Sequence, residues 1–385
     1  MNENTRVLAI TESSMGHKTH SLMMRKYFES SVCQVDIYWS DQEKELFLRI
    51  LNKIISLRIP NKLIQSYNLD FFRVRAQLGY GLLTRRLIER KLSQQKYDQK
   101  YNVLYFHTQP LAFLSLDIMR KTPSVISIDM TNIQASEECN NHKYKWTYNP
   151  NILLEKQVFK AASKVFTCTE WARSSVINDY AIHPDKVVAI PYGVDLKLLP
   201  FIDRDRKSNK EPYNVLFIGG DFKRKGGEDL LDVFLNRFAD DSVLHIVTLD
   251  SINCNHPNVR IYNHVQAYSD AWLQLYRQAD VFVMPTYGDA FGLVFIEAMA
   301  FGLPVIASKL IQTTEIVKEG ETGFLITPGD RQALGDTLQV LIDNPSLGRQ
   351  MGKKARQVVE VNFDTHKNFK KIESIFEQLQ SNALT

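Results

Sequence analysis

The sequence has few of the features that mark membrane-spanning, exported or disulfide-stabilised proteins. It contains no run of about 18 uncharged apolar residues, which excludes a membrane-spanning helix. Residues 1–6 are polar and lead directly into an apolar run, so we expect no secretory signal. The four cysteines are scattered and form no Cys-x-x-Cys pair, which argues against a disulfide framework and a zinc ribbon. The prediction is a soluble, cytoplasmic protein.

Signatures of metal and dinucleotide sites are also missing. The Asp-x-Asp formed by Asp203 and Asp205 lies in a charged linker and does not follow a strand, so we expect no metal ion and no cofactor. No Gly-x-Gly-x-x-Gly follows a strand with an acidic residue about 20 positions later, which disfavours a nicotinamide-dependent dehydrogenase. Nucleic acid is not an expected partner, because the basic residues lack interleaved stacking aromatics in a known binding motif.

The net charge of +4 conceals a strongly basic segment. Residues 49–100 contain twelve basic and three acidic residues, a net charge of +9, which leaves −5 for the rest of the chain. Leucine and isoleucine recur within the segment at helical spacing. This pattern fits an amphipathic surface for anionic lipid headgroups, at the inner face of a membrane, or for an acidic acceptor. A pair of solvated surface helices fits it equally well.

The pattern of apolar runs predicts two α/β domains. A chain of 385 residues is too long for one ordinary core, and two domains imply a cleft between them. In the first half, β-rich runs alternate with segments of helical period, which is typical of a parallel sheet with crossover helices. The predicted strands are 7–10, 35–38, 103–106, 125–128 and 165–167. The alternation breaks in a charged stretch, so we expect domain 1 at 1–197 and a linker at 198–213.

The second half repeats the pattern and predicts another doubly wound unit at 214–362. Its predicted strands are 215–218, 243–248, 259–262, 281–285, 305–307 and 323–326, and its predicted helices are 228–238, 272–279, 291–300 and 331–342. In 363–385, Phe369, Ile372, Phe376 and Leu379 recur at spacings of three and four. This is an amphipathic helix that needs a surface to cover, and we expect it to pack back on the first domain.

The stretch 284–330 is the most informative of the chain. A strand ends near residue 285, a turn carries Asp289, and a helix begins near Phe291, so the amides of Phe291, Gly292 and Leu293 should be free to bind an anion such as phosphate. Glu297 stands in an otherwise apolar helix, where an unpaired carboxylate costs several kcal/mol. We therefore predict that it has a partner, such as sugar hydroxyls. The alternative is a helix carboxylate that reaches solvent, against which its apolar neighbours argue.

This stretch closely resembles the donor-site signature of the retaining glycosyltransferases of family four, the group 1 glycosyl transferases. The resemblance includes two carboxylates separated by seven residues, here Asp289 and Glu297, and the run Gly-Leu-Pro-Val-Ile-Ala-Ser at 302–308. It extends to Ile-Pro-Tyr-Gly-Val-Asp at 190–195. It implies the GT-B fold, in which two Rossmann-like domains face each other across a deep cleft. It also implies that the first carboxylate contacts the donor sugar and the second the ribose. The first is usually glutamate, and Asp289 is shorter by one methylene.

The resemblance assigns further residues to the site. In 217–227, FIGGDFKRKGG, Lys225 matches a cation of the family's diphosphate grip, and Arg224 replaces the arginine expected where Gly220 stands. Two cations at such a turn suit a leaving nucleoside diphosphate. Gly16 resembles a degenerate form of the family's glycine-rich loop. His107, after a predicted strand, resembles the histidine that faces both sugars, although a lone histidine is more often structural. His17, His20 and Asp129 are weaker candidates for the acceptor pocket.

The resemblance predicts a retaining, metal-independent transferase that uses a nucleotide-sugar donor and a glycan, lipid-linked or small-molecule acceptor. In this interpretation the nucleotide binds the second domain, the acceptor binds the first, and closure of the cleft excludes water. A function of a different class, without catalysis, also fits the sequence. A non-catalytic sugar-nucleotide-binding or scaffold subunit of a glycosylation complex would keep the fold, and the departures at Asp289 and Gly220 motivate it.

Overall fold

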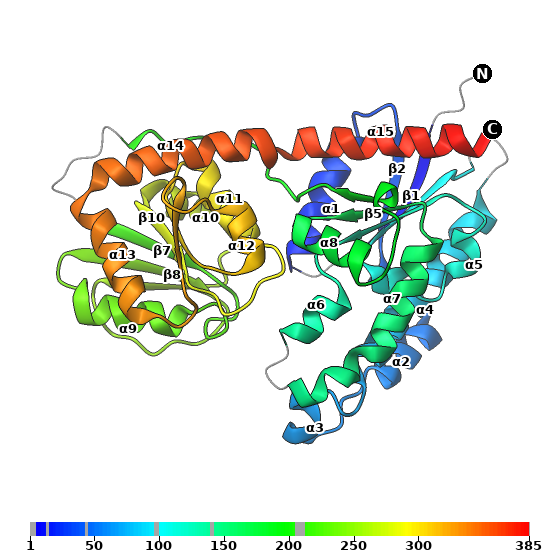
Figure 1. Ribbon diagram of the computed structural model, residues 1–385, viewed down its shortest axis with the longest axis horizontal. Helices are drawn as coiled ribbons and strands as arrows, with labels where there is room; N and C mark the ends of the chain where they lie inside the picture. The colour runs from blue at the N-terminus through cyan, green and yellow to red at the C-terminus, as the bar shows by residue number, and fades with distance from the viewer. Residues whose placement is uncertain are drawn as a thin grey trace. The chain divides into compact units, whose positions relative to one another are not determined.

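The computed structural model describes residues 5–12, 15–42, 45–95, 100–138, 142–204 and 212–384, in two compact units (Figure 1). Unit 1 comprises Met1–Pro191 and His366–Thr385, and unit 2 comprises Tyr192–Thr365. Each unit is built on a six-stranded sheet in which every strand pairing is parallel. The chain passes from unit 1 to unit 2 after Pro191, slightly before the predicted boundary at residue 197.

The sheet of unit 1 has the order β2-β1-β3-β4-β5-β6. Its strands are β1 (Arg6–Thr11), β2 (Gln34–Trp39), β3 (Val103–His107), β4 (Ser124–Ile128), β5 (Lys164–Thr167) and β6 (Val187–Ala189). The first five coincide with the predicted strands. The sixth is missing from the prediction because three residues are too few for a period to show.

Helices cover both faces of this sheet. The helices of unit 1 are α1 (Met15–Phe28), α2 (Leu46–Ile55), α3 (Lys62–Ser66), α4 (Phe72–Gln94), α5 (Leu116–Met119), α6 (Asn132–Glu137), α7 (Asn149–Ala161), α8 (Glu170–Asn178) and α15 (Thr365–Leu384). Alternate residues of a strand point to opposite faces. Val7 and Ala9 of β1 therefore share a core with α1 and α15, whereas Leu8 and Ile10 share one with α4 and α7.

The sheet of unit 2 has the order β12-β11-β10-β7-β8-β9. Its strands are β7 (Tyr213–Ile218), β8 (Ser242–Thr248), β9 (Val259–Asn263), β10 (Val281–Met284), β11 (Val305–Ser308) and β12 (Gly323–Ile326). Its helices are α9 (Gly227–Arg237), α10 (Asp270–Gln278), α11 (Leu293–Ala300), α12 (Ile311–Ile316), α13 (Arg331–Asp343) and α14 (Pro345–Asn362). The order reverses between β7 and β10, so the crevice beyond their carboxyl ends is the expected ligand site of such a sheet.

Part of the stretch predicted as a linker, 198–213, belongs to unit 2, which corrects the prediction. Leu199 is fully buried in the core of unit 2. The Arg204 guanidinium donates hydrogen bonds to the carbonyl oxygens of Tyr276, Ala279 and Phe301 at 2.9, 2.9 and 2.7 Å. Burial lowers the pKa of Arg204 to about 10, so the group stays charged. The charge of Arg204 led to the prediction of an exposed linker, because arginine is rarely buried unless its guanidinium has hydrogen-bond partners. Residues 205–211 lie outside the described residues.

The C-terminal helix α15 supplies apolar side chains to unit 1. Phe369, Ile372 and Phe376 are at most 4% exposed and share a core with Val7 and Tyr105. The Tyr27 hydroxyl donates to the Glu373 carboxylate at 2.8 Å, which ties α15 to α1. The apolar stripe seen in the sequence is therefore the surface by which the end of the chain covers one face of the first sheet.

Candidate functional site

The turn between β7 and α9 in unit 2 is held against the end of β10. Gly226 has φ +75°, and a Cβ at this position would lie 2.1 Å from the carbonyl oxygen of Pro285. Only glycine combines this conformation with so close an approach. The close packing at Gly226 therefore places Arg224 and Lys225, which precede it, next to the loop that follows β10.

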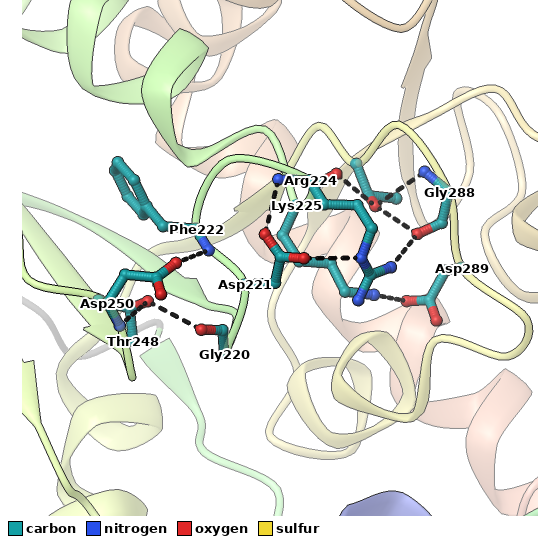
Figure 2. A network of polar contacts seen from close by, with 10 residues as sticks. Gly220, Asp221, Phe222, Arg224, Lys225, Thr248, Asp250, Gly288 and Asp289 are labelled. Carbon is teal, nitrogen blue, oxygen red and sulfur yellow. Dashed lines mark hydrogen bonds and ion pairs between the residues drawn. The ribbon is translucent and has the colours of Figure 1, made fainter. Parts of the chain in front are cut away.

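In that loop the structure brings Lys225 together with Asp289 (Figure 2). Lys225 Nζ lies 2.6 Å from Asp289 Oδ2, and the two side chains are 13% and 16% exposed. The Arg224 guanidinium donates to the carbonyl oxygen of Gly288 at 2.8 Å and pairs with Asp221 at 3.0 Å. Residues 64 positions apart thus form one polar network, with the lysine shielded and the arginine half exposed.

Each of the two cations in this network is paired with one carboxylate, Lys225 with Asp289 and Arg224 with Asp221. An ammonium group has three donors, and Asp289 takes one of them. The Arg224 amide and guanidinium both bond to Asp221, and these contacts, the backbone one foremost, lower the pKa of that carboxyl. The loop is therefore preorganised by ion pairs, and a diphosphate placed there would meet two fixed cations.

Glu297 of α11 has partners within the protein, which differs from the sequence expectation. Its side chain is buried, and the hydroxyls of Tyr268 and Tyr276 donate to Oε1 and Oε2 at 2.9 and 3.2 Å. Burial raises the pKa of Glu297 to about 7, against the opposing effect of the tyrosine hydrogen bonds. The predicted need for a partner is met within the protein by two phenols, and the contact with sugar hydroxyls stays a prediction.

The amides at the start of α11 also differ from the prediction. The helix begins at Leu293 rather than Phe291, with Gly292 as its N-cap. The Leu293 amide donates to the carbonyl oxygen of Phe291 at 2.9 Å, so it is not one of the free donors that the sequence led us to expect. Phe291 packs its ring edge-on against Tyr192, with centroids 5.2 Å apart. The prediction of three donors at this turn therefore needs correction at Leu293.

In unit 1 the predicted histidine lies at the end of β3 and belongs to a cluster. His107 is fully buried, and its Nε2 lies 3.0 Å from His17 Nδ1. The His20 ring stacks on it at 4.8 Å, and the Tyr105 hydroxyl lies 3.3 Å from its Nδ1. Because β1, β3 and β4 are neighbours, the sheet brings α1, His107 and Asp129 to one edge, with Asp129 Oδ2 4.0 Å from His17 Nε2.

Burial keeps His20 and His107 uncharged. Desolvation, together with His17, lowers the pKa of His20 from 6.5 to about 3. Desolvation and the charges of His20 and His17 hold the pKa of His107 well below its usual range. A neutral imidazole offers one donor and one acceptor nitrogen, and those of His107 face His17 and Tyr105, so a substrate hydroxyl can bond to His107 only by displacing one of these neighbours.

The low pKa of His20 predicts sensitivity of the fold to acid. Between pH 3 and 6.5 the unfolded chain binds this proton and the folded one does not, so stability falls as the pH falls. From pH 7 to 5 the wild type should lose about 2 kcal/mol more unfolding free energy than His20→Leu. Urea titrations at both pH values measure this difference. The exposed His183 is the control, and an equal pH dependence in His20→Leu would contradict the argument.

The predicted glycine loop is described only in part. Gly16 lies in the first turn of α1 (Met15–Phe28), directly before His17. Residues 13 and 14, which precede this helix, lie outside the described residues. Gly16 is therefore known to be next to the histidine cluster only through its place in the sequence. Its approach to a donor stays a prediction.

Several residues of both clusters escaped the sequence analysis. Tyr268 and Tyr276 precede Glu297 by 29 and 21 positions, and no local pattern links them to it. The Gln312 amide donates to the carbonyl oxygen of Asp289. In unit 1, the buried Glu155 accepts from Gln109, two residues after His107, at 2.6 Å. The sequence carried no signal for Glu155, because Lys156 and Gln157 follow it in a mixed polar helix, whereas Glu297 stands in an apolar one.

The described part of the chain holds neither a metal-binding cluster nor a membrane-spanning helix. Among these residues no group of three His, Cys, Asp or Glu side chains is arranged to hold a metal ion. None of the described helices combines the length and apolar character needed to cross a bilayer.

Comparisons with known proteins agree with the architecture. The family profile described as Glycosyltransferase Family 4 matches residues 16–198, and that described as Glycosyl transferases group 1 matches residues 200–358. The chain is 26% identical over 246 residues to the capsular polysaccharide biosynthesis glycosyltransferase CapM of Staphylococcus aureus, covering 58% of this chain and 64% of that protein. It is 28% identical over 223 residues to an MMP alpha-(1->4)-mannosyltransferase of Mycolicibacterium hassiacum, covering 54% and 53%. The chain thus spans between half and two thirds of the length of these relatives.

Solved structures share the whole fold at low identity. Sucrose-phosphate synthase from Thermosynechococcus elongatus superposes with a TM-score of 0.74 at 18% identity, over 98% of this chain and 100% of that one. Anabaena Alr3699/HepE in complex with UDP-glucose gives 0.66 at 14% identity, over 97% and 99%. With two consecutive family profiles spanning both units, and two parallel α/β domains of the GT-B type, the chain belongs to the family four, group 1 glycosyltransferases.

Proposed function

We propose that the protein is a retaining, metal-independent glycosyltransferase that uses a UDP- or GDP-sugar donor. The observation that carries the proposal is the pairing of Lys225 and Arg224 with the loop that holds Asp289. Two cations at a strand-to-helix turn compensate the charge that grows on a leaving diphosphate. Two similar proteins support it, since HepE forms a complex with UDP-glucose and CapM is named for capsular polysaccharide biosynthesis. The acceptor is a hydroxyl of a glycan, a lipid-linked saccharide or a small molecule.

In the proposed reaction the acceptor oxygen forms a bond to the anomeric carbon on the face that the diphosphate leaves. The bond between that carbon and the β-phosphate oxygen breaks, and the leaving diphosphate takes the acceptor's proton. Lys225 and Arg224 stabilise the departing group, and Asp289 orients the sugar. No metal ion is needed in this scheme, because Lys225 and Arg224 compensate the negative charge of the leaving diphosphate.

Glu297 is assigned to the ribose of the donor. Its two oxygens already accept from Tyr268 and Tyr276, and a carboxylate has about four lone-pair sites, so it can take ribose hydroxyls in addition. The tyrosines fix the rotamer of the carboxyl group before the donor arrives. In unit 1, His107 is proposed to contact the acceptor and the sugar, with His17, His20 and Asp129 as its surroundings.

A panel of nucleotide sugars tests the proposal. Without added metal, one UDP- or GDP-sugar should raise the melting temperature and be hydrolysed slowly, and both effects should be lost in Lys225→Ala. Differential scanning fluorimetry and a nucleoside-diphosphate release assay measure them. Addition of EDTA should change neither. A requirement for a divalent ion would contradict the metal-independent mechanism.

A scaffold subunit is the second candidate, favoured by the aspartate at position 289 and by Gly220 in place of the family's arginine. Such a subunit would be stabilised by a nucleotide sugar yet release no diphosphate and transfer no sugar. The release assay therefore separates the two functions.

We also propose a cytoplasmic location at the inner face of the membrane, where lipid-linked acceptors are found.

A further inference from the structure

Helix α2 of unit 1 has two apolar faces, and only one of them is covered. The half-buried Leu48, Leu51 and Ile55 lie on the side of the helix that packs against α4. The packing there is tight, since a Cβ at Gly79 of α4 would meet the Asn52 side chain of α2 at 1.9 Å. One face is enough to hold a helix on its domain, so the second apolar face is not explained by folding.

The second face is strongly exposed. In α2, Leu46, Phe47, Ile50 and Ile54 are 69%, 73%, 47% and 57% exposed. The apolar surface continues beyond the helix through Leu57, Ile59 and Leu63, which are 63%, 48% and 62% exposed. These seven residues, the α2 surface, are seven of the twenty large apolar side chains that are exposed in the described residues. Contiguous exposed apolar patches mark interaction sites.

The charges on this segment select the partner. Arg49, Lys53, Arg58 and Lys62 are all exposed, and the sequence from residue 46 to 69 contains no acidic residue. Glu45, directly before the helix, is paired with Arg86 at 2.9 Å. An apolar face bordered mainly by cations is the pattern of helices that lie in the headgroup region of a bilayer. Each such cation near an anionic leaflet contributes about 1 kcal/mol to binding. A protein partner would have to offer an apolar groove with an acidic border.

A basic and aromatic pocket lies next to the α2 surface along the chain. It has a volume of about 370 Å³ and is formed by the loop after α2, by α3 and by the start of α4. The Arg58 guanidinium lies 4.1 Å from the centroid of the Phe72 ring, and that of Arg73 lies 4.4 Å from the centroid of Tyr148. Two arginines held over rings present their donors at fixed positions, which suits a phosphate group.

We propose that the α2 surface binds an anionic phospholipid bilayer, with its apolar side chains in the acyl boundary and its cations at the headgroups. The bound phosphate of a lipid headgroup would occupy the pocket of Arg58 and Arg73. The proposed function, with a lipid-linked acceptor, gives a reason for the protein to bind a membrane. Vesicle binding itself requires no turnover, so it can be tested independently of the enzyme's activity. It assigns the basic segment of the sequence to a defined surface.

Vesicle flotation tests the proposal with the full chain. The wild type should float with phosphatidylcholine vesicles that contain roughly 30% phosphatidylglycerol and stay behind with phosphatidylcholine alone. The triple variant Phe47→Ser, Ile50→Ser, Ile54→Ser should bind at least about tenfold more weakly, because each side chain contributes apolar burial. The double variant Arg49→Gln, Lys53→Gln removes two of the four exposed cations, so it should bind more weakly and lose about half of its dependence on salt.

Matched controls separate this result from unfolding and from failure of the enzyme. Leu249→Ser and Val361→Ser remove apolar side chains of unit 2 that are 61% and 69% exposed, and should float like the wild type. All variants should keep the wild-type melting temperature and its stabilisation by donor. The proposal is overturned if no anionic vesicle binds, or if the triple variant binds normally. It is also overturned if the triple variant instead abolishes self-association of a chain that ignores vesicles.

Discussion

Replacement of Lys225 by alanine is expected to lower kcat for sugar transfer by about a hundredfold to a thousandfold. A loss of this size is typical when one preorganised donor is removed from a group on which charge develops. The lysine is 13% exposed and lies between the Gly-Gly turn and Asp289, so its ammonium group is held at a fixed position. Steady-state kinetics with the donor that stabilises the protein would measure the loss, with a smaller change in KM.

Lys223→Ala is the matched control for this result. Lys223 lies two residues away in the same turn, but it is 82% exposed and faces Glu228 at 3.7 Å. It should keep wild-type kinetics. An equal loss in both variants would mean that general positive charge matters rather than the fixed ammonium group. Wild-type kinetics in Lys225→Ala would remove the lysine from the mechanism altogether.

Glu297→Ala is expected to reduce both donor binding and stability. The donor would lose its ribose contacts, which lowers kcat/KM by roughly tenfold to a hundredfold. In addition, the buried hydroxyls of Tyr268 and Tyr276 would lose their acceptor, at a cost of about 1 to 3 kcal/mol for each group. Calorimetric titration with the donor and thermal melts, both at pH 8 where Glu297 is ionised, measure the two effects separately.

Glu297→Gln distinguishes the two effects. The amide keeps an acceptor for one tyrosine, and the other hydroxyl can turn to accept from its NH₂, so the melting temperature should fall much less than in the alanine variant. Donor binding should still weaken, because a neutral amide is a poorer partner for ribose hydroxyls. If Glu297→Gln bound the donor like the wild type, Glu297 would be a structural residue that organises the tyrosines.

Much of the fold could be predicted because it depends on short-range patterns. Eleven of the twelve strands are runs of β-branched and aromatic residues that the sequence shows directly, and the period of α15 identified its buried face. Arg204 shows the limit of this approach. A charged stretch resembles a linker, and nothing nearby reveals that carbonyl oxygens of Tyr276, Ala279 and Phe301 accept from the guanidinium.

The sequence by itself determined the two parallel sheets, the motif that carries Lys225, Asp289 and Glu297, and the basic segment around α2. These follow from the order of residues along a strand, a turn or a helix, where backbone geometry relates neighbours directly. Only the tertiary structure decided that Lys225 pairs with Asp289, that two tyrosines hold Glu297, and that His107 joins His17 and His20. It also decided which face of α2 stays uncovered. Each of these depends on segments 21 to 90 residues apart, whose meeting is set by strand order and loop conformation rather than by any local period.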